Sequence, residues 1–112
     1  MKYIITIIQP SRLEPLQEAL TGFGIQGMTV SEVQGYGRQQ GKTEMYRGTE
    51  YTVNFLPKIK VECAVDESVA DKVVDAIRET CSTGRIGDGK VFSLDLEGAM
   101  RIRTGETGLS AL

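Results

Sequence analysis

The chain contains no histidine among its 112 residues. This absence removes the usual base of Ser-His-Asp and Cys-His nucleophile activation, and also the commonest ligand of transition metals. Only two cysteines are present, Cys63 and Cys81, and no CxxC pair occurs. The count is too small for a disulfide framework or a zinc knuckle, so both are expected to be reduced, structural thiols. Hydrolytic catalysis is therefore disfavoured, and we expect the protein not to be an enzyme.

Long apolar runs and an excess of positive charge are also lacking. No apolar stretch approaches the ~20 residues that span a membrane, and only six residues separate Met1-Lys2 from Gln9-Pro10, which does not resemble a signal peptide. The formal net charge of −2 differs from the broad basic footprint of a nucleic-acid binder. We expect a cytoplasmic protein that binds no nucleic acid, and any anionic ligand should be small.

The first third of the chain changes from strand to helix character. Residues 2–8 are mainly β-branched and aromatic and are closed by Gln9-Pro10, so they predict a buried strand. Ser11 and Glu14 then have the spacing of a capping box. A helix is predicted from there to about Gly22, with an apolar face formed by Leu13, Leu16, Leu20 and Phe23.

The same alternation returns in the second half. Residues 27–37 and 58–65 predict strands, the latter with Ile59, Val61, Cys63 and Val65 on one face. Asp66 is the expected cap of a helix that ends near residues 81–84. Residues 90–98 predict a last strand, with Phe92, Leu94 and Leu96 on one face.

This order of elements predicts the fold class. One α+β domain over residues 1–112 is expected, with the ferredoxin-like βαββαβ order and helices on one face of an antiparallel sheet. The opposite face would carry Tyr3, Ile5 and Ile7. Such an apolar face is larger than monomers usually expose, which predicts self-association.

Residues 37–55 form a connection that is too long for a compact domain. They show neither helical nor strand periodicity, so no regular element is predicted there. The segment is rich in Arg and Tyr, which is typical of a protein-contact surface; these residues are Arg38, Tyr46, Arg47 and Tyr51. The alternative is a disordered loop without a role.

Two further stretches have the composition of anion sites. "TGRIGDGK", residues 83–90, offers backbone N–H groups and a lysine to phosphates, although a simple glycine-rich turn remains the alternative. It is not a Walker A loop, because Lys90 is followed by Val91 and Phe92. Arg101 and Arg103 would point to one side if their segment is extended, as paired guanidiniums for an anion or as a solvated rim.

Five separated blocks, "GFGIQGMTVSEVQGYGRQ", "YRGTEY", "FLPKIKVE", "TGRIGDGKVF" and "RIRTGE", together resemble the PII nitrogen-regulatory signal-transduction proteins. The resemblance runs essentially end to end. It implies a homotrimer that binds ATP or ADP between neighbouring subunits. It also implies a T-loop at about residues 37–55 between strands 2 and 3, a glycine-rich B-loop at about 82–90 and a C-terminal loop at about 101–112.

The resemblance also implies site residues. The nucleotide would be bound by Thr29, Gly35, Gly37, Arg38, Gln39, Glu62, Ala64, Gly87, Asp88, Gly89, Lys90, Arg101 and Arg103. Beside Mg-ATP, 2-oxoglutarate would bind through the metal, with Gln39 as a Mg²⁺ ligand and Lys58 as the partner of the distal carboxylate. The three effectors would shift the populations of T-loop conformations.

Partners follow from the same resemblance. An ammonium transporter, or an enzyme or regulator of nitrogen metabolism, would be contacted through the T-loop, with Arg47 entering the transporter mouth. Tyr51 would be the residue that a uridylyltransferase modifies. A membrane would be approached only through such a transporter.

Some residues depart from the family pattern, which leaves more than one function open. Gln40 and Gln9 stand where basic residues are frequent, and Thr49 replaces Ala or Ser. A specialised paralogue would bind adenine nucleotide with an altered or absent 2-oxoglutarate response or Tyr51 modification. Two functions of a different class also stay open: a small nucleotide-hydrolysing enzyme that uses Asp88 and Glu62, and a plain ferredoxin-like interaction module.

Overall fold

A computed structural model describes residues 1–36, 43–46, 49–52 and 55–112, and for 43–46 and 49–52 it describes the backbone. Along the chain lie β1 (Lys2–Ile8), the 3₁₀ turn η1 (Pro10–Arg12), α1 (Leu13–Thr21), β2 (Thr29–Gly35), β3 (Thr43–Tyr46), β4 (Thr49–Thr52), β5 (Leu56–Val65), α2 (Glu67–Cys81), β6 (Gly89–Asp95) and the 3₁₀ turn η2 (Gly108–Ala111).

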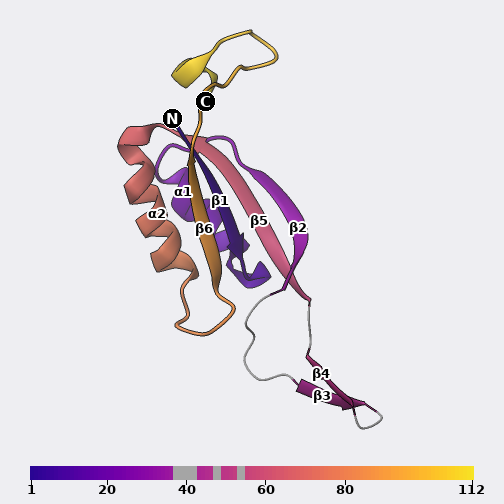
Figure 1. The fold of residues 1–112 in the computed structure, drawn as a ribbon. Helices are drawn as coiled ribbons and strands as arrows, with labels where there is room; N and C mark the ends of the chain where they lie inside the picture. The colour runs from indigo at the N-terminus through magenta and orange to yellow at the C-terminus, as the bar shows by residue number, and fades with distance from the viewer. Residues whose placement is uncertain (37–42, 47–48, 53–54) are drawn as a thin grey trace.

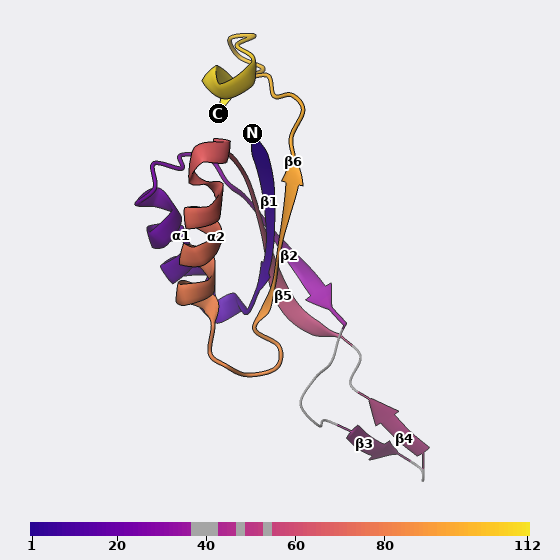
Figure 2. The ribbon, with the colours of Figure 1, turned by 60° about the vertical axis from the view of Figure 1, so that its left-hand side comes forward.

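Four strands form one antiparallel sheet in the order β2-β5-β1-β6, and both helices cover one of its faces (Figure 1, Figure 2). The central strand β1 pairs with β5 and β6 along its whole length. This two-layer arrangement confirms the predicted α+β class and is compatible with the ferredoxin-like order.

The core lies between the sheet and the helices. Its fully buried members are Ile4, Ile8, Leu16, Leu20, Val61, Val73 and Ile77. Burial of each such side chain contributes about 1.5–3 kcal/mol, which binds the layers together. The predicted alternation in β5 is confirmed, because Ile59, Val61, Cys63 and Val65 are all buried. Cys63 and Cys81 are free and buried, as predicted, and burial raises the pKa of both thiols.

The two helices begin in different ways. The predicted cap of α2 is confirmed, because Asp66 accepts a hydrogen bond from the Ser68 N–H at 3.0 Å. The predicted capping box of α1 is wrong. Ser11 lies inside η1, and α1 begins at Leu13 without a side-chain cap. Pro10 starts a tight turn in which the Leu13 N–H donates to the Pro10 carbonyl, so the backbone replaces the side-chain cap.

Two predicted strand and helix positions lie outside their elements. Phe23 follows the end of α1 and is 38% exposed, rather than lying on its buried face. Leu96 follows the end of β6.

The absence of regular structure predicted for residues 37–55 is also wrong, since β3 and β4 form an antiparallel hairpin in which Met45 lies opposite Glu50. The sequence of these two strands shows no regular apolar alternation, so it did not predict their pairing.

The hairpin lies beyond the ends of β2 and β5 in Figure 1. At the other end of the sheet, residues 96–112 leave β6 and form what we call the C-terminal arm. The arm closes on itself, because the Gly108 N–H donates to the Ala99 carbonyl at 3.0 Å and Met100 forms a bridge with Thr107. The sheet therefore has an extension at each end, the β3–β4 hairpin at one and the C-terminal arm at the other.

Candidate nucleotide site

The glycine loop, residues 82–90, joins the end of α2 to the start of β6. Its first half is fastened by Asp88, whose carboxylate accepts hydrogen bonds from the Thr83 N–H at 2.7 Å and the Gly84 N–H at 3.0 Å. The Thr83 hydroxyl donates to the same carboxylate. These hydrogen bonds lower the pKa of Asp88 below its usual value, and the bond from the Thr83 hydroxyl has the largest effect. The Asp88 carboxylate therefore stabilises the conformation of its own loop.

Three glycines in this loop have backbone conformations that other residues rarely adopt. Gly84 has a φ of 78°, Gly87 a φ of 102° and Gly89 a φ of 112°. A Cβ on Gly89 would lie 1.7 Å from the Ile7 carbonyl oxygen. The loop thus passes so close to β1 that only glycine fits at position 89.

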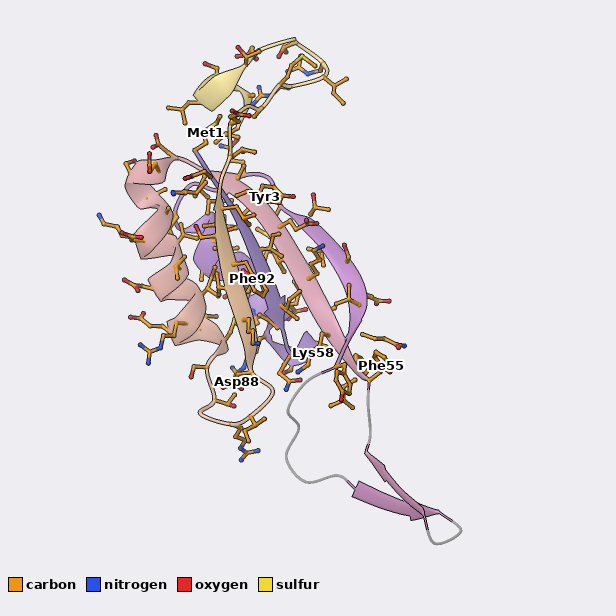
Figure 3. The ribbon with its side chains drawn as sticks, viewed as in Figure 1. Met1, Tyr3, Phe55, Lys58, Asp88 and Phe92 are labelled. Atoms are coloured by element: carbon orange, nitrogen blue, oxygen red, sulfur yellow. The ribbon has the colours of Figure 1, made fainter. Side chains whose placement is uncertain are left out.

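Lys58 enters the site from β5, from the sheet face opposite the helices. Its side chain is packed beside Gly35, where a Cβ would lie 3.0 Å from the Lys58 Cγ. Only 5% of Lys58 is exposed, and its Nζ donates to the Gly87 carbonyl at 2.5 Å. The Gln9 Nε2 donates to the same carbonyl at 2.8 Å. Figure 3 shows Lys58 and the Asp88 loop at the same end of the sheet.

A cavity of about 760 Å³ lies over this end of the sheet. Its lining combines cationic side chains and loop backbone with apolar surface: Ile5, Ile7, Val33, Gln34, Gly35, Tyr36, Lys58, Lys60, Ile86, Gly87, Gly89, Lys90 and Phe92. Lysines and turned glycine backbone suit an anionic group, and the apolar side chains suit a flat ring. Of the predicted site residues, the structure brings together Gly35, Lys58, Gly87, Gly89 and Lys90.

The rest of the predicted residues on this sheet lie outside the cavity. Thr29 on β2 is opposite Glu62 on β5, and neither they nor Ala64 line the cavity. Lys60 pairs with the Glu62 carboxylate at 3.7 Å. Burial, and secondarily the neighbouring Glu62 carboxylate, raise the pKa of Tyr3. This part of the sheet therefore forms a second group of candidate residues, beside the cavity rather than in it.

The two predicted arginines are far from the glycine loop of their own chain. They lie in the C-terminal arm, beyond the far end of β6, and seven residues of strand separate the two regions by roughly 20 Å. Arg101 donates to the Glu106 carboxylate at 3.4 Å and to the Leu112 carbonyl at 3.2 Å. The segment is not extended, because the Gly105 N–H donates to the Arg101 carbonyl at 2.7 Å and closes a turn. The condition under which the two arginines would point to one side is therefore not met.

Comparison with known proteins decides the family. A family model described as "Nitrogen regulatory protein P-II" matches residues 1–106. The chain belongs to the P-II family. It is 56% identical to the nitrogen regulatory protein P-II of Rhizobium etli and 51% identical to the nitrogen regulatory protein GlnK of Escherichia coli K12, in both cases over 112 residues and the full length of both chains. The resemblance inferred from sequence is confirmed, and this P-II chain is a nitrogen-signalling regulator by family.

Residues 37–55, the predicted T-loop, are described only in part. Gly37, Arg38, Gln39 and Arg47 lie outside the described residues, whereas Tyr51 lies in β4 opposite Glu44. The described ends of the segment carry Tyr36 and Phe55, whose ring centroids are 5.9 Å apart. These two exposed rings contact each other where the chain enters and leaves the long connection between β2 and β5.

Sequence reasoning missed three residues around the site. Tyr36 and Phe55 could have been noticed as aromatics that flank the long connection, and Ile86 as an apolar residue within a glycine-rich loop. Gln9 was named as a departure from the family pattern, but its contact with Gly87 was not predicted, because it crosses 78 positions of sequence. No cluster of three or more His, Cys, Asp or Glu side chains that could hold a metal occurs in the described residues. Among these residues, no helix is long and apolar enough to cross a membrane.

Proposed function

We propose that this P-II protein is a non-enzymatic sensor that binds ATP or ADP and 2-oxoglutarate and regulates nitrogen-metabolism targets through its T-loop. The observation that carries the proposal is the 760 Å³ cavity, which combines Lys58, Lys90 and the glycine loop with the root of the T-loop at Gly35 and Tyr36. A ligand there would contact both the loop and the residues that lead into the excursion. Ligand state and T-loop conformation would thereby be coupled.

The glycine loop fits the phosphates of a nucleotide. Gly87 leaves no side chain between the backbone and an incoming oxygen, and Lys90 adds a positive charge. Asp88 acts indirectly in this account, by holding the loop through Thr83 and Gly84. The remaining predicted contacts would come from Thr29, Gly35, Gly37, Arg38, Gln39, Glu62 and Ala64.

The arginines would complete the site from a neighbouring subunit. Because Arg101 and Arg103 lie about 20 Å from the glycine loop of their own chain, they reach a nucleotide only if another copy presents them. A homotrimer would also cover the outer sheet face, where Phe92 and Leu94 are each 49% exposed, and the arm, where Ile102 is 92% exposed.

The cavity also suits a dicarboxylate. The Lys58 ammonium would bind the distal carboxylate of 2-oxoglutarate, while the keto acid end would chelate Mg²⁺ held by ATP and Gln39. Binding of 2-oxoglutarate should then require Mg-ATP and fail with ADP alone. Closure around the metal would draw the root of the T-loop inward and change how the loop docks.

The β3–β4 hairpin would be the surface offered to partners. It contains Tyr51, and Arg47 lies between its two strands in the sequence. Candidate partners are an ammonium transporter, which is the only route to a membrane, and enzymes or regulators of nitrogen metabolism. A uridylyltransferase would transfer a uridylyl group from UTP to the Tyr51 phenol oxygen, with diphosphate as the leaving group, and so add negative charge to the docking surface.

Calorimetric titration with ATP, ADP, and 2-oxoglutarate in the presence of Mg-ATP or ADP tests the proposal. Saturable binding of both nucleotides, and of 2-oxoglutarate only with Mg-ATP, is expected. Native mass should be about 37 kDa, three times the 12.3 kDa chain. Failure to bind either nucleotide would overturn the sensor function and favour a plain interaction module. Steady turnover of ATP would favour the nucleotide-hydrolysing enzyme.

A specialised paralogue is the second candidate, and one observation favours it. Gln9 contributes no charge to the cavity and donates instead to the Gly87 carbonyl, so a dicarboxylate would meet fewer cations than in family members with a basic residue there. Nucleotide would still bind, but 2-oxoglutarate weakly or not at all. The variant Gln40→Lys restores one basic residue of the family pattern. Tighter 2-oxoglutarate binding would support this candidate, and unchanged affinity would count against it.

A further inference from the structure

The Gly87 carbonyl receives two hydrogen bonds from side chains outside the glycine loop. Lys58 Nζ reaches it from β5 at 2.5 Å, and Gln9 Nε2 reaches it from the residue that follows β1 at 2.8 Å. Both contacts are partly buried, and they join positions 29 and 78 residues apart. Asp88 fastens the first half of the glycine loop, whereas these two donors fasten the second half. The second half therefore depends on donors outside the loop.

The two donors differ in where they lie and in charge. Lys58 lines the 760 Å³ cavity, whereas Gln9 does not. The Lys58 ammonium forms a stronger hydrogen bond with a carboxylate than with a neutral carbonyl, so an anion in the cavity competes directly with Gly87 for it. The neutral amide of Gln9 is outside the cavity and is not drawn by that anion. A ligand that draws the Lys58 ammonium away from Gly87 would therefore leave Gln9 as the remaining side-chain donor to that carbonyl.

We propose that Gln9 is a positioning residue that retains the glycine loop by its Gly87 carbonyl when Lys58 turns to an anionic ligand. The inference rests on the proposed function for the identity of that ligand, a dicarboxylate such as 2-oxoglutarate. If the partly buried Gly87 carbonyl had no hydrogen-bond donor, the glycine loop would be destabilised. The ligand would then bind more weakly, because part of its binding free energy would offset this cost. With Gln9 present, Lys58 is released without loss of the loop conformation that Lys90 and Gly89 need for phosphate contact.

Hydrogen exchange of the ligand-free protein tests the two-donor arrangement. Amide exchange across residues 82–90 is compared in the wild type, Gln9→Met, Lys58→Met and the double variant. Each single variant should exchange within about threefold of the wild type, because one donor remains, and the double variant about tenfold faster than either. Gln17→Met, on the exposed surface of α1, is the matched control and should match the wild type. Additive single and double effects would overturn the proposal.

Ligand titration provides a second test that does not depend on Lys58→Met being folded. With Mg-ATP present, Gln9→Met should bind 2-oxoglutarate about fivefold more weakly than the wild type, while its affinity for ATP alone stays within twofold. Equal 2-oxoglutarate affinity in the two proteins would overturn the role of Gln9. If the wild type binds no 2-oxoglutarate, the proposed function fails in that respect, and the exchange experiment still decides whether Gln9 retains the loop.

Discussion

The glycine loop and the C-terminal arm lie at opposite ends of β6 and are held in opposite ways (Figure 1). The loop is tied to the body of its own chain by Lys58, Gln9 and the close passage of Gly89 over Ile7. The arm is bonded largely to itself and leaves Ile102 92% exposed. The loop is held in place by contacts within one chain, whereas the arm exposes an apolar side chain that a second copy would cover.

The largest expected effect comes from adding one methyl group to each region. Gly89→Ala should lower the free energy of unfolding by about 3 kcal/mol or more, because it combines an unfavourable φ with backbone overlap at Ile7. Gly98→Ala, in the arm, has open space around the new Cβ and should stay within about 0.5 kcal/mol. Urea unfolding at equal protein concentration measures both. Equal effects would mean that the loop is not held as closely as described.

Ligand binding should need charge from both regions. Lys90→Ala in the loop and Arg103→Ala in the arm should each weaken ATP binding by about 10–100-fold, the usual loss for a charge-assisted contact. Lys72→Ala, on the exposed surface of α2, is the matched control and should bind like the wild type. Unchanged affinity in Arg103→Ala would remove the arm from the site while leaving the loop in place.

The arm should matter more to assembly than to the stability of one chain. Ile102→Ser should weaken the trimer by about 2 kcal/mol per interface, since the side chain is exposed in the chain and is expected to be covered by a neighbour. Thr104→Ser keeps a hydroxyl that can accept from the Glu106 N–H, and it serves as the control. Native mass over a dilution series measures the effect. A trimer of undiminished stability in Ile102→Ser would contradict the proposed covering of the arm.

The smallest effect should be a pH dependence that belongs to the loop alone. Hydrogen bonds from Thr83 and Gly84 lower the folded-state pKa of Asp88, so its contribution to stability is present above the unfolded value of 3.8 and is lost as pH falls through the folded value. Asp88→Asn should therefore be less stable than the wild type at pH 6, and the gap should close at pH values below the folded pKa. Urea unfolding midpoints of the two proteins, measured from pH 6 to pH 2.5, follow this stability difference. A difference that persists below the folded pKa would show that the charge of the Asp88 carboxylate is not its cause.

The sequence predicted the elements that are defined by burial. Alternation located β5, helical spacing and Asp66 located α2, and the five sequence blocks identified the family. It mispredicted features set by backbone geometry. Ser11 had the pattern of a cap, but Pro10 starts a backbone turn before the helix, and the pairing of β3 with β4 left no apolar alternation in the sequence.

The candidate site was predictable in its residue types but not in its grouping. Lys58 and the loop glycines were named from the resemblance, and the structure brings them together. The contact of Gln9 with Gly87 depends on the pairing of β1 with both β5 and β6, which local sequence does not encode. The separation of Arg101 from the glycine loop likewise became visible only once β6 placed them at its two ends.

The central claim, that each nucleotide site joins the loop of one subunit to the arm of another, is tested most directly with mixed trimers. Lys90→Ala chains and Arg101→Ala/Arg103→Ala chains are refolded together in equal amounts and titrated with ATP. Neither variant alone should bind tightly, but random mixing restores an intact pair at roughly a quarter of the interfaces, so about a quarter of the wild-type number of tight sites should return. No recovery of tight sites in the mixture would contradict the account.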